Sequence, residues 1–116
     1  GLVTLYLGLT QPEVYGKLGV MSPSVWWDHR VILKMVAGLQ HSQRQRMWLD
    51  IGTEEGSAPF SSIRDVRLLK ATLVSKGWRE GRNLGYMEAE GADHSERAWA
   101  ERVPLMLEFL FPRKVK

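Results

Sequence analysis

One histidine, two adjacent glutamates and an aromatic pair are the residues of this sequence best suited to form a reaction site. His94 lies in one polar segment, Glu54 and Glu55 lie in a second, and Trp26 and Trp27 lie in a third. A carboxylate that orients a histidine makes that histidine a general base able to activate a hydroxyl nucleophile. The combination therefore predicts acid–base chemistry beside an aromatic surface, provided that the three segments meet in the fold.

Three apolar runs precede these three segments and predict the strands that would bring them together. The runs cover residues 17–22, 46–52 and 84–90. Helical spacing of apolar residues predicts helices at 1–10, from about residue 28, over 61–77 and around 99–110. Strands that alternate with helices form a mainly parallel sheet of the α/β class with right-handed crossovers. The three loops then lie together at the carboxyl ends of the strands, where α/β proteins carry their sites.

Details at the helix ends follow from residue type. Ser61 or Ser62 is predicted to cap the start of the third helix, and Gly77 is predicted to cap its end. Pro104 predicts a kink or a first regular turn in the last helix. Residues 1–10 are apolar on almost every side, which predicts a buried helix.

A parallel sheet of three strands needs cover on both faces and leaves an edge open. Together with the apolar first helix, this predicts that part of the sheet is missing from the chain. Either a removed segment or a second chain would supply it.

Four segments resemble the putative esterase family of the α/β-hydrolases, which includes enterochelin esterases, feruloyl esterases and S-formylglutathione hydrolase. The segments are KLGVMSPSVWW at 17–27, WLDIGTEE at 48–55, GADHSERAW at 91–99 and LEFLFP at 107–112. Each motif alone is moderately specific, but their order and spacing cover nearly the whole chain. The resemblance implies a partial α/β-hydrolase fold, with residues 1–116 as the C-terminal part of one domain that lacks the N-terminal strands and the nucleophile elbow.

The same resemblance implies a serine carboxylic-ester hydrolase that works through an acyl-enzyme on a small-molecule ester. His94 would be the general base, and Glu55 would be the acid because it follows Gly52 in the family's G-T-x-acid spacing, with Glu54 as the alternative. The nucleophilic serine would lie roughly three residues before Gly1, in a G-x-S-x-G elbow. The chain alone is then expected to be inactive. Trp26 and Trp27 either line the substrate pocket or pack in the core.

Other polar residues receive structural interpretations. Ser22 and Ser24 are predicted to be turn and cap residues. Asp50, within a strand, is predicted to be a buried hydrogen-bonding residue, and Asp93 is predicted to point away from its neighbour His94.

Several partner classes are not expected. The chain has no cysteine, and His29 and His41 lack partners at metal-ligand spacing, so no metal or cofactor is expected. The net charge of +3 comes from scattered basic residues, so no nucleic-acid partner is expected. No apolar run approaches the ~18 residues of a membrane span, so no membrane partner is expected.

Two rival interpretations remain open at this point. The chain could be a noncatalytic α/β module that forms a homo-oligomer through an open sheet edge or an exposed apolar helix. A flavodoxin-like binding domain is the third candidate, and it would lack a converging glutamate–histidine pair.

Overall fold

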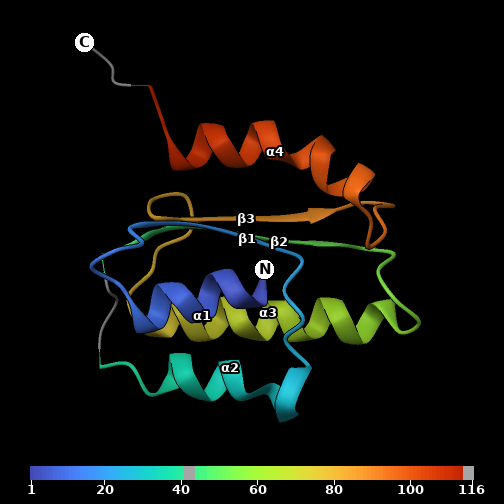
Figure 1. Ribbon diagram of the computed structural model, residues 1–116. Helices are drawn as coiled ribbons and strands as arrows, with labels where there is room; N and C mark the ends of the chain where they lie inside the picture. Colours follow the sequence, from blue (N-terminus) through green and yellow to red (C-terminus); the bar gives the residue numbers. More distant parts are fainter. Residues whose placement is uncertain (41–43, 114–116) are drawn as a thin grey trace.

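The computed structural model describes residues 1–40 and 44–113 and has the α/β architecture predicted from the sequence (Figure 1). Within these residues the order is helix, then strand and helix three times. The elements are α1 (Leu2–Thr10), β1 (Lys17–Met21), α2 (Trp27–Ala37), β2 (Arg46–Gly52), α3 (Pro59–Ser75), β3 (Leu84–Ala89) and α4 (Glu96–Leu110). The prediction of the fold class is therefore confirmed.

The three described strands form one parallel sheet in the order β1-β2-β3. Leu18 pairs with Met47, and Met47 pairs with Leu84, so all three strands end at the same edge. Helix α4 lies on one face, α1 and α3 lie on the other, and α2 packs against α1 and α3 farther from the sheet (Figure 1). The loops that follow β1, β2 and β3 therefore share one end of the molecule.

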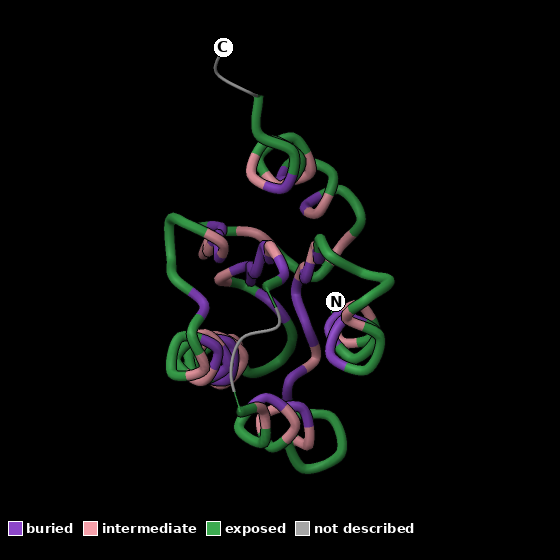
Figure 2. Tube along the Cα trace, turned by 90° about the vertical axis from the view of Figure 1, so that its left-hand side faces the viewer, coloured by how far each residue is buried: buried purple, intermediate pink, exposed green. Residues whose placement is uncertain are grey.

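The central strand carries the core. Every residue of β2 from Met47 to Gly52 is buried, as expected for a parallel strand with both faces covered. Figure 2 shows buried residues on the strands and on the sides of the helices that face them. Trp78, shortly after the end of α3, is fully buried in this core, and its indole N–H donates to the carbonyl of Gln45.

Helix α1 differs from the prediction of a helix buried on every side. Leu5 and Leu9 are buried, but Val3 is 69% exposed and Tyr6 is 50% exposed. The reason is that α1 packs mainly on β1 and α2, so its outer side has no cover among the described residues. Strand β1 is also paired on one side only within that part of the chain.

Helix α2 begins close to the predicted position but starts irregularly. Asp28, His29 and Arg30 have φ angles of 48°, 52° and 60°, so three consecutive residues occupy the left-handed region. Each such residue costs on the order of 1–2 kcal/mol relative to right-handed geometry. The Arg30 guanidinium donates to the buried Asp65 carboxylate at 2.9 Å, which ties this turn to α3.

The predicted end of α3 is confirmed, whereas its predicted start is wrong. Gly77 has φ 111° just beyond the last turn, the conformation that favours glycine at a helix end. At the start, α3 begins at Pro59, and its N-cap Ala58 makes no side-chain hydrogen bond, so neither Ser61 nor Ser62 caps it. Proline suits a first turn because its φ is preset and its missing N–H has no partner there. In α4 the helix continues through Pro104.

An ion pair between α3 and β3 gives the chain a predicted pH dependence. Arg67 donates two hydrogen bonds of 2.7 Å to Glu88, and the Tyr86 hydroxyl donates a third. These bonds lower the pKa of Glu88 from 4.5 to about 2, and those from Arg67 make the largest contribution to the shift. Because the folded-state pKa is the lower one, the pair stabilises the fold fully above pH 4.5 and loses that contribution as the pH falls toward 2.

We therefore expect Glu88→Gln to destabilise the chain at pH 6 and to have a shrinking effect below pH 4.5. The difference at pH 6 should stay below about 1 kcal/mol, because Arg67 is largely exposed and the pair is screened. Urea unfolding at pH 6, 4 and 3 measures it, with Glu90→Gln as the control for loss of an exposed charge. A difference between wild type and Glu88→Gln that grows on acidification would contradict the assignment.

Candidate active site

The loops after β2 and β3 bring Glu55 and His94 into contact. Nδ1 of His94 lies 2.7 Å from Oε1 of Glu55. An ionised carboxylate only accepts hydrogen bonds, so Nδ1 carries the proton and Nε2 keeps its lone pair when the imidazole is neutral. This arrangement has the geometry of a general base oriented by a carboxylate.

The carboxylate of Glu55 is buried and fixed by two further donors. Its other oxygen, Oε2, accepts the backbone N–H of Gly52 at 2.6 Å and the hydroxyl of Ser22 at 2.6 Å. A Cβ on Gly52 would lie 2.3 Å from the carbonyl oxygen of Ala92, so only glycine lets the two loops approach this closely. The Glu54 N–H donates to the same Ala92 carbonyl and joins the loops further.

Glu55, which the resemblance favours as the acid, and Glu54, its alternative, take different positions. Glu55 turns inward to His94, whereas Glu54 is exposed and contributes its backbone to the loop contact. Geometry therefore favours Glu55 as the partner of the histidine.

The start of α4 orients His94. Ser95 caps the helix by accepting the N–H of Ala98, and its hydroxyl donates to Asp93. Asp93 is thus engaged beside the loop and not on the imidazole, as predicted. The ring of Trp99, one turn into α4, meets the imidazole edge-to-face with centroids 4.8 Å apart.

A cavity of about 450 Å³ opens beside His94 at the leading end of α1. Its lining includes Gly1, Leu2, Val3, Trp26, Trp27 and His94. The two tryptophans are 62% and 53% exposed, so they form its wall and are not packed in the core. A second cavity of about 270 Å³ lies between the loops after β1 and β2 and also reaches His94.

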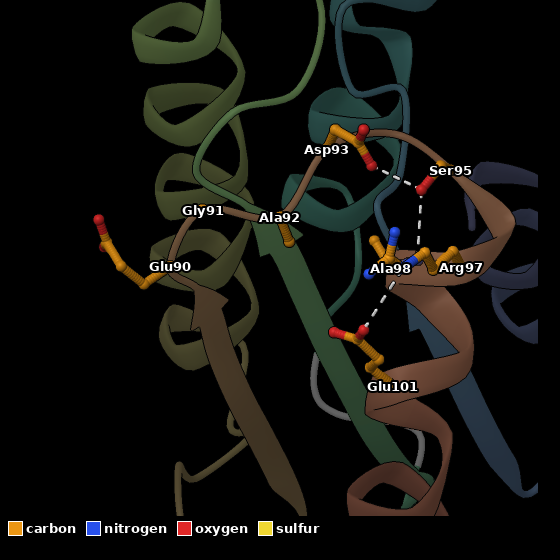
Figure 3. A pocket seen from close by; sticks show the side chains of 8 residues that line it. All are labelled: Glu90, Gly91, Ala92, Asp93, Ser95, Arg97, Ala98 and Glu101. Atoms are coloured by element: carbon orange, nitrogen blue, oxygen red, sulfur yellow. Dashed lines mark hydrogen bonds and ion pairs between the residues drawn. The ribbon is translucent and has the colours of Figure 1, made fainter.

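A third hollow, of about 280 Å³, lies between the loop that follows β3 and the start of α4 (Figure 3). It is rimmed by charged side chains, among them Glu90, Asp93 and Glu101, and Arg97 pairs with Glu101. Neither Glu55 nor His94 lines it, so the two cavities described above are the ones that reach the histidine.

A buried polar cluster lies beneath this pair, and of its members only Asp50 was assigned a buried hydrogen-bonding role from the sequence. The guanidinium of Arg102, on α4, donates hydrogen bonds of 3.0 and 3.1 Å to the two carboxylate oxygens of Asp50 and also donates to the Ser22 hydroxyl. The prediction that Asp50 is a buried hydrogen-bonding residue is confirmed, because it is fully buried and also accepts the indole N–H of Trp48. Ser22 is more than the turn residue predicted, since it binds Glu55 directly. A signal was available: Arg102 falls three residues after Trp99, on the face of α4 that must meet the sheet.

Within residues 1–40 and 44–113, no group of three or more acidic, histidine or cysteine side chains could hold a metal ion. His29 is exposed, and His41 lies outside the described residues. In the same part of the chain, no helix has the length and hydropathy to cross a bilayer.

A parallel sheet flanked by helices, with a histidine fixed by a carboxylate at the strand ends, is an arrangement typical of the α/β-hydrolase fold. The comparison with protein families is more specific: the family described as "Esterase: Putative esterase" matches residues 1–110. The chain belongs to this family.

Individual proteins resemble most of this chain in sequence or in fold. The uncharacterized protein YbbA of Bacillus subtilis (strain 168) is 25% identical over 115 residues, which are 96% of this chain and 45% of that protein. Two solved structures share the fold at 18% identity: the BES protein from Bacillus cereus and the siderophore hydrolase EstB from Aspergillus nidulans. The match to the BES protein has a TM-score of 0.66 and covers 92% of this chain and 40% of the BES chain. The match to EstB has a TM-score of 0.59 and covers 99% of this chain and 47% of the EstB chain. The chain thus spans less than half the length of each.

Proposed function

We propose that this chain is the C-terminal part of a serine carboxylic-ester hydrolase, with His94 as its general base and Glu55 as the carboxylate that orients it. The observation that carries the proposal is the 2.7 Å contact between Nδ1 of His94 and Glu55, beside an aromatic cavity at the strand ends. Membership of the esterase family supports the reaction class.

The proposed reaction has two acyl-transfer steps. A serine hydroxyl attacks the ester carbonyl while Nε2 of His94 takes its proton, and the C–O bond to the alcohol breaks as His94 returns that proton to the leaving oxygen. Water then attacks the acyl-enzyme, His94 takes the proton of the water, and the proton passes to the departing serine. Glu55 stabilises the imidazolium formed in each step.

The nucleophile is proposed to precede Gly1. Among the described residues, no serine or threonine hydroxyl hydrogen-bonds to His94, and Ser22 is engaged with Glu55. Gly1 lies at the cavity that holds His94, so residues just before it would enter the site directly. A G-x-S-x-G elbow there would also supply one backbone N–H of the oxyanion hole.

The N-terminal strands of the domain are proposed to pair with the free edge of β1 and to cover α1. The exposed Val3 and Tyr6 support this arrangement, as does the greater length of the relatives. Trp26 and Trp27 are proposed to contact the acyl or alcohol group of a small-molecule ester, since such pockets are mostly apolar and aromatic.

Hydrolysis of p-nitrophenyl acetate tests the proposal in two forms of the protein. The chain of residues 1–116 should show no turnover above its His94→Ala variant, because among the described residues no serine or threonine hydroxyl is hydrogen-bonded to the base. The extended polypeptide is the product of the same reading frame with the codons upstream of Gly1 included. It should hydrolyse the ester, and its His94→Ala variant should lose this activity. Turnover by the 116-residue chain that depends on His94, or an inactive extended polypeptide, would refute the proposal.

A second candidate function is a noncatalytic, self-associating module. It is favoured by an apolar groove of about 550 Å³ between α1 and α2, whose lining includes the exposed Val3, Tyr6 and Trp27. On this alternative, sedimentation equilibrium of the chain would show a concentration-dependent oligomer that Tyr6→Lys dissociates. A monomer at all concentrations would exclude it.

A further inference from the structure

The hydroxyl of Ser22 lies at the centre of the buried cluster beneath the Glu55–His94 pair. Ser22 follows β1 directly and is buried, with φ 45°. Its Oγ lies 2.6 Å from Oε2 of Glu55, 2.9 Å from Nη2 of Arg102 and 3.2 Å from Nε1 of Trp99. Three partners surround one oxygen, so the direction of each hydrogen bond can be deduced.

The hydroxyl can point its proton only at Glu55. A guanidinium and an indole N–H donate hydrogen bonds and cannot accept them. Arg102 and Trp99 therefore occupy the two lone pairs of the Ser22 oxygen, which leaves its single proton for the carboxylate. Ser22 is in this way an obligatory donor to Oε2 of Glu55.

Arg102 is held in place by the central strand. It is 2% exposed, and its Nε and Nη2 contact Oδ2 and Oδ1 of Asp50 at 3.0 and 3.1 Å. Asp50 also accepts the backbone N–H of Ser22 at 3.0 Å. The orientation of the serine is thus set from two sides by the same ion pair.

These contacts leave one oxygen of Glu55 for the histidine. Oε2 is filled by Ser22 and by the Gly52 N–H, so Oε1 alone faces Nδ1 of His94. The cluster holds two carboxylates and one guanidinium, and Nη2 of Arg102 is 4.0 Å from Oε2 of Glu55. Its formal charge is therefore −1, which an imidazolium at His94 would neutralise. A general base carries that positive charge after it has taken its proton.

We propose that Ser22 and Arg102 are positioning residues that act on His94 through Glu55. They hold the carboxylate in the rotamer that selects the Nδ1–H tautomer of the imidazole and keeps Nε2 free. The catalytic meaning of this role depends on the proposed function, whereas the geometry itself can be tested in the 116-residue chain without any activity.

Nitrogen-15 NMR of the His94 imidazole in the 116-residue chain tests the proposal. In the wild type at a pH where the ring is neutral, Nδ1 should carry the proton. In Ser22→Ala, which removes one donor to Glu55 and leaves the Arg102–Asp50 pair, the tautomer should shift toward Nε2–H. The Nδ1 proton should also exchange with solvent about tenfold faster, the factor expected for loss of one charge-assisted hydrogen bond.

Two further variants separate positioning from general loss of stability. Arg102→Lys keeps the positive charge but loses the paired hydrogen bonds from Nε and Nη2 to Asp50, and we expect the same tautomer shift. Arg67→Met removes an equally close ion pair elsewhere and should leave the His94 signals unchanged. A folded Ser22→Ala variant with wild-type tautomer and exchange rate would overturn the proposal, even if Arg102→Lys fails to fold. An inactive extended polypeptide would refute the esterase function and leave this NMR result intact.

Discussion

Replacing Glu55 by glutamine is expected to lower the kcat of the extended polypeptide toward p-nitrophenyl acetate by about 10⁴-fold, with a small change in KM. The carboxamide keeps the size of the side chain, but it can turn its NH₂ toward Nδ1 of His94. The imidazole then carries its proton on Nε2 and cannot act as a base, which is the loss known for the matching substitution in serine proteases.

Glu54→Gln is the matched control for this experiment. Glu54 is adjacent in sequence and exposed, whereas His94 is bonded to Glu55, so activity should stay within about twofold of wild type, as for most surface substitutions. Equal losses in the two variants, or the larger loss in Glu54→Gln, would show that Glu55 is not the orienting acid.

The second large effect concerns the ion pair beneath the site. Asp50→Asn is expected to lower the free energy of unfolding by about 3–5 kcal/mol, because it removes the carboxylate that both Nε and Nη2 of the buried Arg102 contact and leaves only Glu55, 4.0 Å away, as a counter-charge. Adding Arg102→Met removes the guanidinium that has lost its main partner and should recover a substantial part of the loss. Urea unfolding of the two single variants and the double variant closes the cycle.

Glu88→Gln calibrates this result, because it breaks an ion pair whose arginine is exposed and should cost below about 1 kcal/mol. If the effects of Asp50→Asn and Arg102→Met simply add, the two side chains are not coupled, and the description of the cluster is wrong.

The sequence was sufficient to predict the strands and to predict that the loops after them lie at one edge of the sheet. Strand β2 has the predicted bounds, because the apolar run at 46–52 is interrupted only by Asp50 and ends at Gly52. The alternation of strands and helices predicted a parallel sheet, which is the pairing observed. A parallel sheet places the loops of Glu55 and His94 at one edge. Their contact at 2.7 Å required coordinates, since sequence spacing does not fix loop conformation.

The sequence was not sufficient where several elements determine one side chain. Arg102 is buried although arginine is usually exposed, and only the meeting of α4 with β2 brings it to Asp50. The resemblance favoured Glu55 over Glu54 as the acid, but the contact between Glu55 and His94 depends on a close approach of Gly52 to Ala92 that the spacing does not encode. The outer side of α1 is exposed because burial depends on which elements surround a helix, and its apolar composition does not supply them.

The measurement that addresses the central proposal most directly is labelling of the extended polypeptide by a fluorophosphonate, with the modified residue identified by mass spectrometry. We expect one adduct, on a serine in a G-x-S-x-G segment just before Gly1, formed at least about 10³-fold more slowly in His94→Ala, since that histidine activates the nucleophile. An adduct on any other residue, or a labelling rate that does not depend on His94, would contradict the proposed role of the Glu55–His94 pair.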